Sequence, residues 1–218
     1  LARYGLEEHV RDWNRALAAL SRQVPGVLVA GDVTTTGIAL EPDGTMSYSE
    51  LHEVYTEQVS ALLEADVDLL VIETMLGVNE TVVALEAARS LCEKPVLCSL
   101  TVQSDGSCYF GGDCLEAVET LQALGADAVG INCSCGPEQL VSLVRNMKKI
   151  AAVPLLVKPN AGMPTISDTG EAVYPMTPQD FAACMRRLVG EGASVVGGCC
   201  GTTPEFIAAL HDALKKAD

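Results

Sequence analysis

A chain of 218 residues is long enough to fold as one domain around a sizeable core. Its formal net charge of −15 argues against a nucleic-acid-binding surface or an anionic membrane surface, and it fits an ordinary solvated acidic surface. Hydrophobic residues make up 49% of the chain and aromatic residues only 4%, so small aliphatic side chains dominate the interior. No apolar run approaches the roughly 20 residues of a membrane span, and the sequence does not open with a signal segment.

In chain order, residues 1–24 have the pattern of a helix, and six apolar, β-branched runs then alternate with segments of helical periodicity. The predicted strands are 27–33, 68–74, 96–102, 128–134, 155–161 and 194–200. The predicted helices between and after them are 48–65, 79–92, 113–124, 137–150, 178–191 and 204–216. The last helix has Thr203 as its N-cap and Pro204 at its first position. This alternation predicts a parallel sheet covered by helices.

Three strand entries resemble one another, namely ADVDLLVIET (65–74), LGADAVGINC (124–133) and EGASVVGGCC (191–200). They introduce every second strand, and alternate strands build common layers inside a (β/α)8 barrel. We therefore interpret the α/β fold as a TIM barrel rather than as a doubly wound open sheet. Only six units are visible, so we expect the first two strands to be missing. Residues 1–218 would then form a single, N-terminally incomplete barrel domain.

The nine cysteines are an odd count in a chain too long and too apolar for a small disulfide scaffold. We expect a cytoplasmic protein with reduced thiols. Cys92, Cys98, Cys114 and Cys184 fit the role of small core residues.

The reactive side chains gather at the ends of the predicted strands, where barrel active sites lie. They are Asp32, Glu73, Thr101, Cys133, Asn160, Cys199 and Cys200. The related strand entries place Cys133 in register with Cys200, so this third cysteine is expected near the adjacent pair. Neighbouring residues of a regular strand point to opposite faces, but the glycines at 197, 198 and 201 allow the backbone to turn.

Three converging thiolates suit Zn²⁺, and three protein ligands leave the open position of a catalytic site. Cys135 is an alternative fourth ligand that would close the site. A rival interpretation of GGCCGTTP is a phosphate cradle before a helix N-terminus. Glu73 also fits a helix-terminal acid, and Asn160 also fits a simple turn residue. The three histidines lie in predicted helices, away from the strand ends, at positions 9, 52 and 211.

Several motifs, in order along essentially the whole chain, resemble the homocysteine S-methyltransferase family. They are YGLEEHV, GDVTTTG, VIETM, VGINCS, VKPNAGMP, GEAVYPMTPQDFA and VVGGCCGTTPEFI. The match is nearest to the homocysteine-binding modules of cobalamin-dependent methionine synthases. The pairing of GGCCGTTP with an upstream NC is the specific part of this signature.

The resemblance implies a zinc-dependent methyltransferase that methylates the thiolate of homocysteine to give methionine. It implies that Cys133, Cys199 and Cys200 bind zinc, and that Glu73 and Asn160 lie at the amino-acid end of the substrate. Metal coordination would keep the substrate thiol deprotonated, so no catalytic residue beyond the metal site is expected. The methyl donor stays open among methylcobalamin on a separate module, a methylfolate-linked corrinoid protein, betaine and S-methylmethionine, and the resemblance favours a corrinoid donor. No nucleic-acid or membrane partner is expected.

Two other functions fit the same sequence. A phosphate-binding barrel isomerase or aldolase would use the last glycine loop, with Lys158 as its only candidate strand-end lysine. A non-catalytic zinc-binding barrel would keep the cysteines without turning over substrate.

Overall fold

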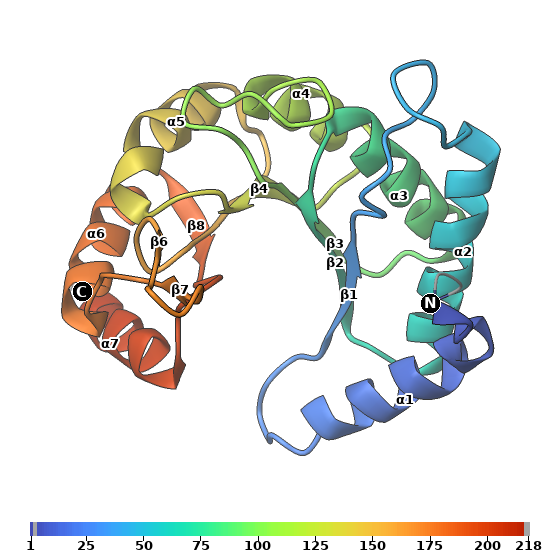
Figure 1. The fold of residues 1–218 in the computed structure, drawn as a ribbon, viewed down its shortest axis with the longest axis horizontal. Coiled ribbons are helices and arrows are strands. Elements are labelled where there is room, and N and C mark those ends of the chain that lie inside the picture. The colour runs from blue at the N-terminus through green and yellow to red at the C-terminus, as the bar shows by residue number, and fades with distance from the viewer. Residues whose placement is uncertain (2–3, 216–218) are drawn as a thin grey trace.

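The computed structural model describes residues 1 and 4–215, and it has the predicted α/β architecture. Six parallel strands form one sheet in the order β1-β2-β3-β4-β5-β8. The sheet curves into an arc, with the strands on its inner side and the helices on its outer side (Figure 1). Residues 2–3 and 216, which the sequence prediction placed in the first and last helices, lie outside the described residues.

The strands of the sheet are β1 (Ala30–Thr34), β2 (Leu69–Met75), β3 (Val96–Leu100), β4 (Ala128–Cys133), β5 (Leu155–Pro159) and β8 (Ala193–Val196). The helices are α1 (Val10–Ser21), α2 (Tyr48–Glu64), α3 (Val78–Leu91), α4 (Cys114–Ala123), α5 (Pro137–Ile150), α6 (Pro178–Gly190) and α7 (Pro204–Lys215). A 3₁₀ turn (Glu7–His9) precedes α1, and strands β6 (Thr165–Ile166) and β7 (Ala172–Val173) form a small antiparallel hairpin. None of the helices in the described part of the chain is long and apolar enough to cross a membrane.

The predicted helices and strands are confirmed, but several of them begin or end at other residues than predicted. The first helix is shorter than predicted, because a 3₁₀ turn replaces its start and it ends before the Pro-Gly pair at 25–26. The last strand ends at Val196 instead of residue 200, so the cysteine pair lies in the turn that follows it. The β6–β7 hairpin was not predicted, because its two-residue strands carry no measurable alternation.

Side-chain caps explain where several helices begin. Ser47 accepts a hydrogen bond from the backbone N–H of Glu50, whose carboxylate accepts one from the Ser47 N–H in return, which makes a capping box. Asp113 caps α4 and Thr177 caps α6 by the same type of contact with first-turn N–H groups. These three short polar residues end the connections that lead into α2, α4 and α6, and they fix where those helices start.

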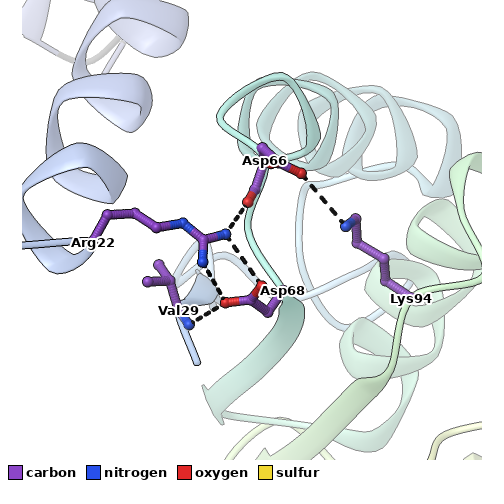
Figure 2. Close-up of polar contacts among 5 residues, drawn as sticks. All are labelled: Arg22, Val29, Asp66, Asp68 and Lys94. Atoms are coloured by element: carbon purple, nitrogen blue, oxygen red, sulfur yellow. Dashed lines mark hydrogen bonds and ion pairs between the residues drawn. The ribbon is translucent and has the colours of Figure 1, made fainter. Parts of the chain in front are cut away.

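Ion pairs connect the C-terminal end of α1 to the end of the sheet at which the strands begin (Figure 2). The Arg22 guanidinium donates to both carboxylate oxygens of Asp68, at 2.7 and 3.2 Å, and to the backbone carbonyl of Asp66. The Asp68 carboxylate also accepts a 2.6 Å hydrogen bond from the Val29 N–H, and Lys94 lies 3.9 Å from the Asp66 carboxylate. These contacts therefore fix the ends at which the strands begin. The loops that follow the strands lie at the opposite end of the sheet.

Candidate metal centre

A row of polar residues lies on the concave face of the sheet. Alternate strand residues point to opposite faces, and the residues that pack against the helices include Val33, Ile72, Cys98, Ile131 and Val157. The neighbouring positions therefore face the inside of the arc, and they carry Asp32, Glu73, Ser99, Asn132 and Lys158. All five positions lie one or two residues from the end of their strands.

The three predicted ligand cysteines converge above this row. Cys133 is the last residue of β4, and Cys199 and Cys200 follow β8. One ligand atom from each lies within 4.8 Å of the others, and the sulfurs of Cys133 and Cys200 are 3.7 Å apart. Zinc–sulfur bonds of about 2.3 Å in a tetrahedron separate two sulfurs by about 3.8 Å, so the donor set fits a zinc ion.

The backbone leaves regular strand geometry at each cysteine. Cys133 and Ser134 have left-handed backbone angles, with φ of 57° and 62°. Gly201 has φ of 77°, and a side chain there would overlap the ring of Tyr174. Because β8 ends at Val196, the two adjacent cysteines are not restricted to opposite faces of a strand. The sequence expectation that glycines release this restriction is consistent with that turn.

The turn after β5 holds the cysteine pair in place. The Cys199 N–H donates to the Pro159 carbonyl at 2.9 Å, and the Cys200 carbonyl accepts from the Ala161 N–H at 2.9 Å. The buried Asn160 side chain accepts a 3.1 Å hydrogen bond from the Cys200 N–H. The structure therefore places Asn160 beside the cysteine turn, whereas its predicted role at the substrate stays a prediction.

Asn132, which is not among the site residues predicted from the sequence, connects the cysteines to the polar row. Its side-chain oxygen accepts hydrogen bonds from the Thr74 N–H (2.9 Å) and the Ser99 hydroxyl (2.8 Å). Its amide nitrogen donates to the Thr74 hydroxyl at 2.7 Å and lies 3.8 Å from the Cys199 sulfur. The available signal was the register of the related strand entries, which aligns Asn132 with Glu73 and Cys199.

The pKa values of the Cys133 and Cys199 thiols are shifted in opposite directions. The hydrogen bond from the Cys133 thiol, with further ones from the Cys200 N–H and from Asn132, lowers the pKa of Cys199 to about 5 despite its partial burial. The same Cys133–Cys199 contact, together with burial, raises the pKa of Cys133. The centre therefore holds one thiolate that neighbouring donors stabilise, which is the form that binds a metal ion.

Cys135 is not a member of this group in the described part of the chain. It is buried in the hydrophobic core, and burial raises the pKa of its thiol to about 11. The structure therefore gives the alternative of a closed, four-cysteine site no support. Among the cysteines predicted to be core residues, Cys98 and Cys114 are buried, and Cys92 and Cys184 are partly exposed.

The other predicted strand-end residues lie on the same face. Glu73 forms an ion pair with Lys158, and about a quarter of each side chain is exposed, 24% and 23% respectively. Asp32 lies near both, and the surrounding protein together with the Glu73 carboxylate raises its pKa to about 6. Thr101 is buried and contacts the Ser134 hydroxyl at 3.2 Å. Lys158, the lysine that an aldolase or isomerase would need, is thus bound to a carboxylate.

Comparison with known proteins identifies relatives of this chain. A model of the homocysteine S-methyltransferase family matches residues 1–214. Methionine synthases of Mycobacterium tuberculosis and Mycobacterium leprae are 30% and 29% identical to it, over 95% and 100% of the chain. Those alignments cover 18% and 19% of the two enzymes, so the chain spans about a fifth of the length of these curated relatives.

Solved structures show the same fold. The apo form of the homocysteine methyltransferase MmuM from Escherichia coli superposes with a TM-score of 0.71 at 26% identity, covering 93% of this chain and 70% of that one. The metallated form gives a TM-score of 0.70 at 26% identity, covering 93% and 66%. The six β/α units of this chain therefore share the fold of the MmuM structures, which confirms the predicted fold class.

Proposed function

The chain belongs to the homocysteine S-methyltransferase family, and from this premise we propose that it methylates the thiolate of homocysteine to give methionine. The observation that supports this most strongly is the convergence of Cys133, Cys199 and Cys200 at the ends of two strands. Three sulfur ligands from the protein leave one tetrahedral position for the substrate thiol.

We propose zinc as the metal, because thiolates are ligands that zinc accepts and the sulfur spacing matches its bond lengths. When bound, zinc would keep the substrate sulfur as a nucleophilic thiolate at neutral pH. Asn132 and the backbone around Asn160 would hold the cysteine side chains in position before substrate arrives. Glu73 would bind the substrate ammonium and thereby orient the sulfur toward the donor.

The methyl donor and the partner are also proposals. We propose a methylcobalamin-bearing protein or module, in keeping with the resemblance of the motifs to cobalamin-dependent methionine synthases. In the described residues β1 and β8 each have a strand partner on one side only. Two further parallel strands between them would complete the eight-stranded domain. The nine free thiols support the cytoplasm as the location.

Methyl transfer from free methylcobalamin to L-homocysteine tests this function. Zinc-loaded protein should form methionine, and the Cys199→Ser variant should lose nearly all of that activity because a metal ligand is gone. Cys184→Ser, which changes a cysteine outside the centre, is the matched control and should keep the activity. Equal methionine formation by wild type and Cys199→Ser would contradict the proposal.

A further inference from the structure

A tyrosine from the β6–β7 hairpin lies against the turn that carries the cysteine pair. Tyr174 directly follows β7, and its ring packs so closely on Gly201 that a Cβ added there would lie 2.2 Å from the ring. Gly201 is the residue after Cys200, so the ring covers the backbone of the metal centre. The motif GEAVYPMTPQDFA contains this tyrosine, to which the proposed function assigns no role.

Backbone hydrogen bonds hold this tyrosine at a fixed place relative to the cysteines. The Met176 N–H donates to the Ala161 carbonyl at 3.1 Å, and the Ala161 N–H donates to the Cys200 carbonyl at 2.9 Å. Gly162 has φ of 92°, and a Cβ added there would lie 2.9 Å from the Met176 side chain. The turn after β5 therefore joins the segment of Tyr174 to the cysteine turn through tight contacts on both sides.

The hydroxyl of Tyr174 is in contact with the thiol of Cys200. Burial and this contact raise the pKa of the hydroxyl, and the charges of Cys133 and Cys199 act in the same direction. The hydroxyl therefore keeps its proton at neutral pH and is available as a hydrogen-bond donor. Cys200 is exposed, whereas the other two cysteines of the centre are partly buried. Its sulfur is thus the one that an electrophile reaches most easily.

The proposed reaction needs one sulfur to be more reactive than its neighbours. In the metal-loaded centre the three protein thiolates and the substrate thiolate are all nucleophiles beside the same methyl donor. A hydrogen bond to a thiolate draws electron density from the sulfur and makes it less nucleophilic. The Asn132 amide, 3.8 Å from the Cys199 sulfur, is placed to act on that ligand, and Tyr174 is placed to act on Cys200.

We propose that the Tyr174 hydroxyl donates a hydrogen bond to the Cys200 sulfur in the metal-loaded centre and lowers its reactivity toward electrophiles. This inference rests on the proposed function and makes Tyr174 a positioning residue, which acts through Cys200 without touching the substrate. The substrate thiolate then remains the preferred nucleophile, and the most exposed metal ligand is protected from alkylation. The same hydrogen bond stabilises the thiolate form of Cys200 and so strengthens metal binding.

Alkylation by iodoacetamide in excess zinc, followed by mass spectrometry of peptides, tests the inference. Each event joins the acetamide carbon to a cysteine sulfur and releases iodide. Cys200 should react about 10-fold faster in Tyr174→Phe than in wild type, because the variant keeps the ring and loses only the hydroxyl. The rate at Cys133 should stay close to its wild-type value. Tyr48→Phe, which removes a hydroxyl bonded to Glu86 near the surface, is the matched control and should leave the Cys200 rate unchanged.

Competition with a zinc chelator gives a second readout, in which Tyr174→Phe should bind zinc about 10-fold more weakly than wild type. Equal Cys200 rates in wild type and Tyr174→Phe, equal acceleration at Cys133 and Cys200, or an unchanged zinc affinity would each overturn the inference and leave the proposed function standing. A wild type that binds no zinc would overturn the proposed metal centre, and this inference with it.

Discussion

Asn132 is fully buried, and its side chain joins β2, β3 and the cysteine turn through separate contacts. Its replacement by alanine would leave the Thr74 N–H without an acceptor in the protein. A buried unpaired donor costs about 1–3 kcal/mol, so Asn132→Ala should lower the free energy of unfolding by that amount. Urea denaturation followed by circular dichroism measures it. Asn146→Ala, on the exposed side of α5, is the control, and an equal effect of both variants would show that the Asn132 contacts contribute nothing.

The acid–base behaviour of Asp32 predicts a pH dependence of stability in the metal-free protein. Its pKa rises from an ordinary value of 3.8 to about 6 on folding, so the folded state binds the proton more tightly than the unfolded state. This contribution to stability is present below pH 4 and is lost as the pH rises through about 6. Asp32→Asn cannot ionise, so its free energy of unfolding relative to wild type should increase between pH 4 and pH 7. A difference that stays constant over this range would contradict the assignment.

At the residue scale, the sequence predicted the cysteines and Glu73 because strand ends can be read from hydrophobic runs and barrel sites lie there. The Lys158–Glu73 ion pair could not be predicted, because it joins residues 85 positions apart on strands that are not neighbours in the sheet. Asn132 was not selected because it lies inside an apolar run. Its importance depends on three partners that only the folded chain brings together.

At the scale of elements, α3 supports the loop that follows β1. Glu80, in its first turn, is 3% exposed, and its carboxylate accepts hydrogen bonds from the Thr35 hydroxyl (2.7 Å), the Thr36 N–H (2.8 Å) and the Tyr55 hydroxyl (2.9 Å). This single side chain therefore links α2, α3 and a strand-end loop on the side of the metal centre. Hydrogen bonds to a buried charge stabilise more than neutral ones do.

Glu80→Gln should destabilise the protein by about 1–3 kcal/mol, because the amide NH₂ group cannot accept the bonds that one carboxylate oxygen now accepts. The matched control is Glu86→Gln in the same helix, where the carboxylate accepts a hydrogen bond from Tyr48 near the surface. That change should cost less than about 1 kcal/mol. Denaturant unfolding of the two variants compares them directly. A loss no larger for Glu80→Gln than for Glu86→Gln would show that the buried network adds no stability.

The sequence predicted most elements because strand and helix periodicities differ. The early end of β8 was missed because the apolar run continues through the cysteines. A glycine-rich turn and a strand have the same hydrophobic pattern there, and only the backbone geometry separates them.

At the scale of the whole molecule, the outer strands β1 and β8 each have one side that pairs with no other strand in the described residues. The cavity beside β1, which α1 and α2 also line, has a volume of about 780 Å³. Exposed apolar side chains lie near both free sides, among them Leu17, Leu28, Val195 and Ile207. The unpaired backbone groups of β1 and β8 can therefore pair with further strands.

Amide hydrogen exchange should therefore be slowest in the central strands β3 and β4 and fastest in β1 and β8. The central strands are paired on both sides, whereas the outer ones are paired on one. Mass spectrometry of peptides from Ala30–Thr34 and Ala128–Cys133 compares the two cases. Equal protection of both peptides would show that another strand, from a second copy or elsewhere, covers the free side of β1.

The most direct test of the account is the zinc content of the folded chain after purification under reducing conditions. Wild type and Cys184→Ser should each hold about one zinc ion per chain, and Cys200→Ser should lose it, because two thiolates and water bind zinc far more weakly than three thiolates. A folded, reduced wild type without zinc, or a Cys200→Ser variant that retains it, would contradict the assignment of the three cysteines as the metal centre.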